Sequence, residues 1–105
     1  GQDIGQMCLL GTFSEYTVVP MASVIKVDQG SPLDRAAVIG CCVPTGYGSV
    51  VKTAGVRPGD AVVVMGVGGI GANALQGAKA AGARYVIAID PVEFKRAKAL
   101  EFGAT

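Results

Sequence analysis

Histidine is absent from the 105 residues, and the three cysteines show no C-x-x-C spacing. An odd cysteine count without such spacing argues against a disulfide framework and indicates a cytoplasmic protein. Charge is also sparse, because nine basic and eight acidic residues leave a net charge of +1. This balance gives no electrostatic reason for the chain to bind nucleic acid or an anionic membrane.

A continuous apolar run long enough to span a membrane is missing as well. The stretch 61–78 carries no charge, but five glycines, Asn73 and Gln76 interrupt it, so we expect no transmembrane helix. The sequence instead has 50% hydrophobic residues and 16 glycines. That composition suits a buried parallel sheet with tight connections.

The most informative stretch is Gly66-Val-Gly-Gly-Ile-Gly71, which fits the pattern G-x-G-x-x-G. It follows strand-forming residues, 61–65, and precedes a helix-forming stretch, 72–81. The first glycine permits a sharp turn, the second lets a pyrophosphate approach the backbone, and the third lets the helix pack close to the strand. The helix N-terminus would present unpaired N–H groups and the positive end of its dipole to phosphate.

A second buried strand, 85–89, ends at Asp90. A carboxylate at this position can accept hydrogen bonds from an adenosine ribose. Strand, glycine turn, helix, strand and acid in this order favour dinucleotide binding over a purely structural turn. Asp90 could alternatively cap the helix expected after Pro91, and one carboxylate could do both.

The other segments divide the chain into a β-rich end, 1–42, and the start of a doubly wound α/β domain, 43–105. Residues 1–11 have no clear period, and the absence of an initiator methionine leads us to expect a part of a longer protein. The remaining expected elements are strands at 12–19 and 23–27, a helix begun by Ser31 and Pro32, a loop at 41–44, a helix from Thr45 to Gly55, and a helix from Pro91 to Gly103.

Several blocks of the sequence point to one family. They are Gly11–Val19, Ser31-Pro-Leu33, Gly40-Cys41 followed by Pro44-Thr-Gly-Tyr-Gly48, the glycine motif, Lys79-Ala-Ala-Gly-Ala83, Asp90 and Gly103-Ala-Thr105. Together these blocks resemble the zinc-containing medium-chain alcohol dehydrogenases. The sequence of residues 6–13 is also similar to an actinobacterial branch that keeps its nicotinamide cofactor bound.

The resemblance implies an α/β fold, in which residues 43–105 are the N-terminal part of an NAD-binding Rossmann domain with a doubly wound parallel sheet. Residues 1–42 would be the C-terminal part of a GroES-like catalytic domain. The intact parent would be a homo-oligomeric oxidoreductase that moves hydride between an alcohol or aldehyde and NAD with a catalytic zinc. The 105 residues alone would be inactive.

The resemblance also assigns individual residues. Cys41 would be the third protein ligand of the zinc, and Thr45 would lie beside the nicotinamide. Asp90 and Lys95 would contact the adenosine ribose. The remaining zinc ligands, including a histidine, would lie before residue 1, and Cys42 stands where the family usually has glycine. The pyrophosphate would be held by the backbone of Gly66, Val67, Gly68, Gly69, Ile70 and Gly71.

Each assignment has a plainer alternative. Cys41 could be a small buried hydrophobe, as Cys8 and Cys42 are expected to be. Thr45 could cap its helix, and Lys95 could belong to a solvated helix face with Arg96 and Lys98. At the level of function, the alternatives are a methyltransferase that uses S-adenosylmethionine and a non-catalytic nucleotide-binding module.

Overall fold

The computed structural model describes residues 11–105, which form two compact units. The first ends at Ser31, and the second spans Pro32–Thr105. Cys8 and most of the predicted irregular segment 1–11 lie outside the described residues. The assignment of 1–42 and 43–105 to two family domains stays a prediction.

The strands predicted at 12–19 and 23–27 are wrong for this structure. Residues 11–31 form turns and a short 3-10 helix, η2 (Met21–Ser23), with no strand. Val18 is 99% exposed and Ile25 is 86% exposed, so their apolar side chains pack on no core. Strand-forming residues require a paired strand and a surface to pack on, and residues 11–31 have neither.

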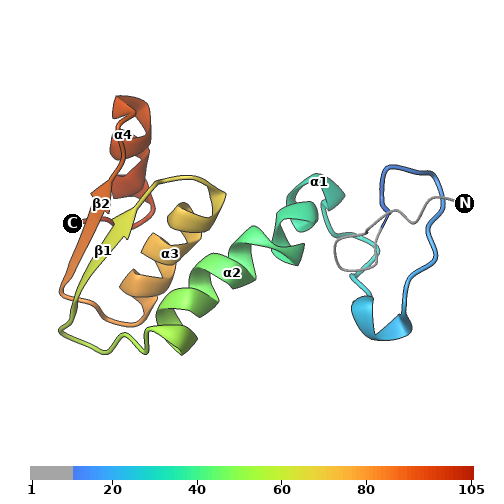
Figure 1. The fold of residues 1–105 in the computed structure, drawn as a ribbon, viewed down its shortest axis with the longest axis horizontal. Helices are drawn as coiled ribbons and strands as arrows, with labels where there is room; N and C mark the ends of the chain where they lie inside the picture. Colours follow the sequence, from blue (N-terminus) through green and yellow to red (C-terminus); the bar gives the residue numbers. More distant parts are fainter. Residues whose placement is uncertain (1–10) are drawn as a thin grey trace, which may run out of the picture. The chain divides into compact units, whose positions relative to one another are not determined.

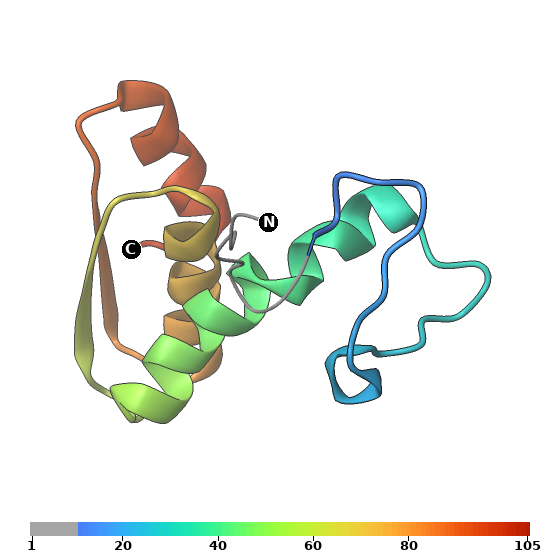
Figure 2. The same cartoon turned by 45° about the vertical axis from the view of Figure 1, so that its right-hand side comes forward.

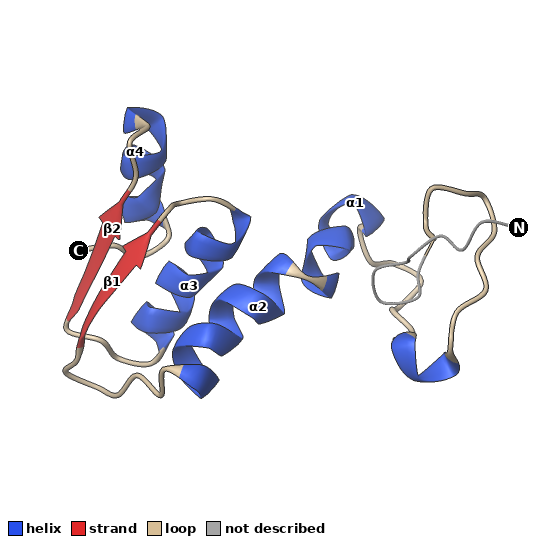
Figure 3. Cartoon of the chain, viewed as in Figure 1, coloured by secondary structure: helices blue, strands red, loops and turns tan. Residues whose placement is uncertain are grey.

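The second unit holds all of the longer elements (Figures 1 and 3). In the described residues, no helix has the length and apolar character needed to cross a membrane. In chain order the elements are α1 (Leu33–Ala36), the 3-10 helix η3 (Ala37–Gly40), α2 (Cys42–Gly48), the π-helical segment η4 (Ser49–Thr53), β1 (Ala61–Met65), α3 (Gly69–Ala80), β2 (Tyr85–Ile89) and α4 (Glu93–Glu101).

The prediction of a loop at 41–44 is wrong, because α2 already begins at Cys42. Pro44 suggested a break, but it lies in the first turn of α2. There a proline removes no intrahelical hydrogen bond, since the first N–H groups of a helix have no partner. The helical path then continues through η4 and ends near Gly55, whose φ of 61° suits a glycine.

Small shifts also occur at other helix starts. Pro32 is the N-cap of α1 and not its first residue, and Ser31 donates its backbone N–H to the carbonyl of Asp28. α4 begins at Glu93 with Val92 as N-cap, two residues after Pro91. Such differences of one or two residues are usual at helix ends.

β1 and β2 pair in parallel, with Ala61 opposite Tyr85 and Met65 opposite Ile89. α3 connects them and packs on both strands, and α2 packs on the far side of α3 (Figure 2). Leu75 of α3 is completely buried at the centre of this arrangement. The core around it comprises Val50, Val64, Val67, Ala74, Ala78, Val86 and Ala99.

The other face of the two strands is apolar and open among the described residues. Met65 is 82% exposed, and the neighbouring side chains of Val63, Ile87 and Ile89 are about half exposed. A parallel sheet normally has helices on both faces. The observed two-stranded α/β arrangement is therefore the start of a Rossmann-type doubly wound sheet, as the sequence predicts.

Candidate functional site

The glycine motif links β1 to α3 and has the geometry expected of a nucleotide-binding turn. Gly66 has a φ of 92°, which side chains disfavour, and it donates its N–H to the carbonyl of Ile89 at 2.7 Å. A Cβ on Gly71 would collide with the carbonyl oxygen of Gly66. At Gly68, by contrast, a Cβ would meet no atom within 4 Å. The first and third glycines thus serve the fold, and the second leaves free space above the backbone.

α3 begins at Gly69, directly inside the motif and three residues earlier than the sequence suggests. The N–H of Ala72 donates to the carbonyl of Gly68 at 2.8 Å and closes the first turn of the helix. The preceding N–H groups of the helix have no intrahelical acceptor, and the dipole of the helix adds partial positive charge there. This edge of the unit can accept an anionic group such as a phosphate.

Asp90 follows β2 and turns its carboxylate toward the glycine motif. It is 6% exposed. Its Oδ2 accepts the backbone N–H of Val67 at 2.8 Å, and its Oδ1 accepts that of Val92 at 2.9 Å. One carboxylate therefore connects the end of β1 to the start of α4.

The same contacts keep Asp90 ionised. The backbone N–H of Val67 and then that of Val92 lower the pKa of Asp90 from its ordinary value of 3.8, and burial opposes them. Lys95 and Arg96 lower this pKa further through their charges. The Nζ of Lys95 lies 3.9 Å from Oδ2.

Arg96 has a role that sequence reasoning missed. Its Nη1 donates to the carbonyl of Asp90 at 2.7 Å and to that of Pro91 at 2.9 Å. It therefore fixes the turn between β2 and α4 and does not merely face solvent. Lys98, whose Nζ lies 2.8 Å from Oε1 of the exposed Glu101, fits the interpretation of a solvated helix face. A contact to backbone carbonyls leaves no signature in the sequence.

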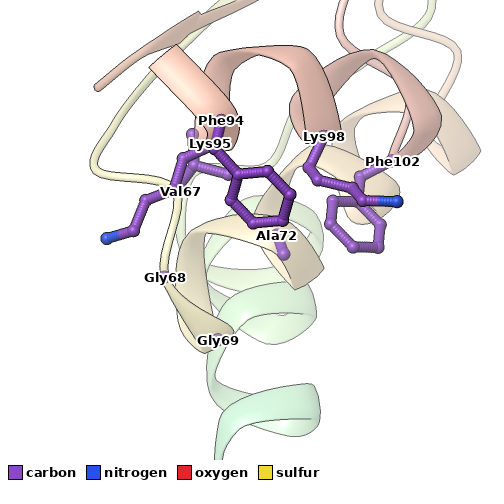
Figure 4. Close-up of a pocket in the computed structure, with 8 residues that line it drawn as sticks. All are labelled: Val67, Gly68, Gly69, Ala72, Phe94, Lys95, Lys98 and Phe102. Carbon is purple, nitrogen blue, oxygen red and sulfur yellow. The ribbon is translucent and has the colours of Figure 1, made fainter. Parts of the chain in front are cut away.

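A pocket of about 440 Å³ opens between the glycine motif and α4 (Figure 4). Its apolar walls include Phe94 and Phe102, and Lys95 brings a cation to its rim. The full lining is Val67, Gly68, Gly69, Ala72, Phe94, Lys95, Lys98 and Phe102. The pocket lies beside the open space above Gly68.

Cys41 and Thr45 lie at the start of α2. Cys41 is exposed and is the N-cap residue. Thr45 is the fourth residue of the helix and donates its N–H to the carbonyl of Cys41 at 3.0 Å. The alternative that Thr45 caps the helix is therefore wrong, because the helix begins three residues before it.

The structure thus brings the glycine motif, Asp90 and Lys95 together, and these residues fit a dinucleotide. Zinc is different. Among residues 11–105 no three side chains of the metal-binding types gather, and histidine is absent from the sequence. Cys41 can offer one thiolate, but the described residues do not complete a zinc site.

Comparisons with known proteins identify relatives of this chain. The family model described as "Zinc-binding dehydrogenase" matches residues 69–105. The whole chain is 59% identical to alcohol dehydrogenase B of Mycobacterium tuberculosis and 59% identical to the NDMA-dependent alcohol dehydrogenase of Amycolatopsis methanolica. The chain spans 28% of the length of each.

Solved structures give the same result. A crystal structure described as an alcohol dehydrogenase zinc-binding domain protein from Burkholderia ambifaria matches 77% of this chain and 22% of its own, with a TM-score of 0.71 and 41% identity. The likeness to alcohol dehydrogenases extends beyond the glycine motif, which argues against a methyltransferase. Over its whole length, the chain is therefore similar to one part of the zinc-dependent medium-chain alcohol dehydrogenases.

Proposed function

We propose that the protein carrying this chain is an oxidoreductase that moves hydride between a small alcohol or aldehyde and NAD, and that residues 61–105 hold the adenosine and pyrophosphate half of the cofactor. The observation that carries this proposal is the meeting of the α3 N-terminus and the Asp90 carboxylate at one edge of the sheet. The names of its relatives support the reaction type.

Different residues would bind the pyrophosphate and the adenosine ribose. The pyrophosphate lies against the backbone at Gly68 and Gly69, where no Cβ intervenes and the helix dipole attracts it. Each oxygen of Asp90 accepts one backbone N–H. Because a carboxylate has about four acceptor positions, it keeps the capacity to accept the ribose hydroxyls. Lys95, close to that carboxylate, adds a donor.

The hydride-transfer end is assigned from the family alone. We propose that Thr45 lies beside the nicotinamide and that Cys41 supplies one zinc ligand. When bound, zinc acts as a Lewis acid toward an alcohol oxygen. The described residues do not complete that metal site.

Gly68→Ala in the full-length protein tests the nucleotide site. The added methyl meets no protein atom, so the fold stays intact. It would separate the pyrophosphate from the backbone, and we expect the Kd for NAD to rise on the order of tenfold, or about 1.4 kcal/mol.

The measurement is a titration of NADH fluorescence. Gly48→Ala is the matched control, because its methyl also enters open space but lies in α2. Equal NAD affinity of Gly68→Ala and the wild type would contradict the proposed position of the pyrophosphate.

A further inference from the structure

Cys42 lies next to the glycine motif. It is the first residue of α2 and is half-buried. A Cβ built on Gly69 would lie 3.5 Å from both the Cβ and the Sγ of Cys42, which is ordinary van der Waals contact. The thiol also donates to the carbonyl of Val38 at 3.4 Å. The Cys42 side chain therefore lies between the start of α2 and the first residue of α3.

Asn73 joins the same contact from α3. Its Nδ2 donates to the carbonyl of Gly69 at 2.7 Å and also approaches the Sγ of Cys42 to 3.8 Å, within the range of a weak hydrogen bond to sulfur. The amide thus bridges the first peptide of α3 and the sulfur on α2. On the other side of this amide, the Oδ1 of Asn73 accepts from Nε2 of Gln76 at 3.5 Å.

One turn farther along α2, the two helices touch through their backbones. A Cβ on Gly46 would collide with the carbonyl oxygen of Ile70. This approach leaves little room for the start of α3 to shift sideways. The sulfur of Cys42 lies at the same end of the helix pair, next to Gly69.

We propose that Cys42 is a positioning residue for the dinucleotide site. It acts through Asn73 and Gly69, and it keeps the first-turn N–H groups of α3 aimed at the pyrophosphate. This inference rests on the proposed function. It gives a role to a residue that differs from the glycine usual in the family, and that role involves no metal.

The test is a set of variants of the full-length protein, with NADH fluorescence, zinc content and steady-state kinetics as measurements. We expect Cys42→Ala to raise the Kd for NAD about three- to tenfold. The KM for NAD rises with it, whereas kcat at saturating NAD and the zinc content stay unchanged. Cys42→Ser keeps a donor and an acceptor, so its Kd lies between those of the wild type and Cys42→Ala.

Asn73→Ala approaches the same contact from the other helix and serves even if Cys42→Ala fails to fold. We expect a similar rise in Kd, and the double variant Cys42→Ala/Asn73→Ala is no worse than the more affected single variant. Ser49→Ala is the control, because it removes a side-chain hydrogen bond, from Oγ to the carbonyl of Gly46 at 2.8 Å, that involves neither Cys42 nor Asn73.

Unchanged NAD affinity in Cys42→Ala and Asn73→Ala, with a wild type that binds NAD, overturns the positioning role and leaves the proposed function intact. A loss of zinc from Cys42→Ala overturns it in favour of metal binding. A wild type that binds no NAD overturns the proposed function, and the positioning role with it.

Discussion

We propose that cofactor choice depends on Asp90. Its carboxylate would accept hydrogen bonds from the ribose hydroxyls of NAD, whereas it would repel the 2′-phosphate of NADP. Charge-assisted hydrogen bonds contribute about 1.5–3 kcal/mol, or roughly 10- to 150-fold in affinity. We expect the full-length protein to prefer NAD, and Asp90→Ser to weaken NAD by an amount in this range while improving NADP.

Paired titrations with NAD and NADP measure this effect. Asp60→Ser is a matched control, because Asp60 also accepts a backbone N–H, from Arg57 at 2.8 Å, in a turn outside the glycine motif. If the wild type binds NADP as tightly as NAD, the prediction is wrong. The Asp90 carboxylate would then only accept the backbone N–H groups of the glycine motif and of the start of α4.

The lowered pKa of Asp90 also predicts how stability depends on pH. A carboxylate whose pKa is lower in the folded than in the unfolded state stabilises the fold above the unfolded value, near 3.8. That contribution disappears as the pH falls below 3.8 and through the folded value. Asp90→Asn should therefore unfold in less urea than the wild type at pH 7, and the difference should shrink below pH 3.8. A gap that is constant with pH would mean that the ionised form is not what the N–H groups of Val67 and Val92 stabilise.

The two adjacent cysteines should respond differently to the same change. In the full-length protein, we expect Cys41→Ser to lose most of the zinc, because a serine oxygen is a harder and less acidic ligand than a thiolate. Cys42→Ser should keep the zinc, since in the wild type the sulfur of Cys42 lies near Gly69 and Asn73. Metal analysis of the two purified variants decides, and a larger loss at Cys42 would exchange their roles.

At the scale of elements, helix packing between α2 and α3 depends on glycine. A Cβ at Gly46 would contact the carbonyl of Ile70 and lie 2.8 Å from the Cβ of Asn73. We expect Gly46→Ala to destabilise the full-length protein by about 1–3 kcal/mol, because the helices must move apart.

Urea unfolding of the Gly46→Ala variant gives the free-energy difference. Gly48→Ala, on the same helix, adds its methyl to open space and should be neutral or slightly stabilising, since alanine favours a helix. Equal stability of the two variants would show that the helix pair adjusts freely.

The elements that the sequence predicted well are those with local signals. β1 and β2 are short apolar runs of branched residues, and the glycines mark the turn before α3. The order of strand, turn, helix and acid therefore predicted the position of Asp90. The start of α2 was missed because Pro44 indicates a break anywhere except in a first turn.

The missed contacts are tertiary and leave no pattern in the sequence. Arg96 binds two backbone carbonyls, and Cys42 meets Asn73 from another helix. The strand predicted at 12–19 is the opposite kind of error, because a local pattern is present but the expected element is not. Their composition is typical of a strand, but a strand forms only where a partner strand is present.

At the scale of the whole molecule, exposed apolar surface should govern how the 105 residues behave alone. One face of the sheet is open, with Met65 82% exposed and Ile87 about half exposed. Exposed apolar surface favours association. We expect the purified 105-residue chain to self-associate in sedimentation velocity, and Met65→Lys with Ile87→Thr to reduce this. A stable monomer with sharp, dispersed amide NMR signals would contradict the expectation.

The central position of α3, between the sheet and α2, has a consequence for the timing of motion. Amides of a buried central helix exchange with solvent only in rare, large openings, whereas those of peripheral loops exchange in small, frequent ones. The N–H groups proposed to meet the pyrophosphate begin this helix, whose Leu75 and Ala78 are fully buried. We therefore expect the edge proposed to receive the pyrophosphate to keep its shape between rare openings of α3, so that binding there would incur little cost in backbone entropy.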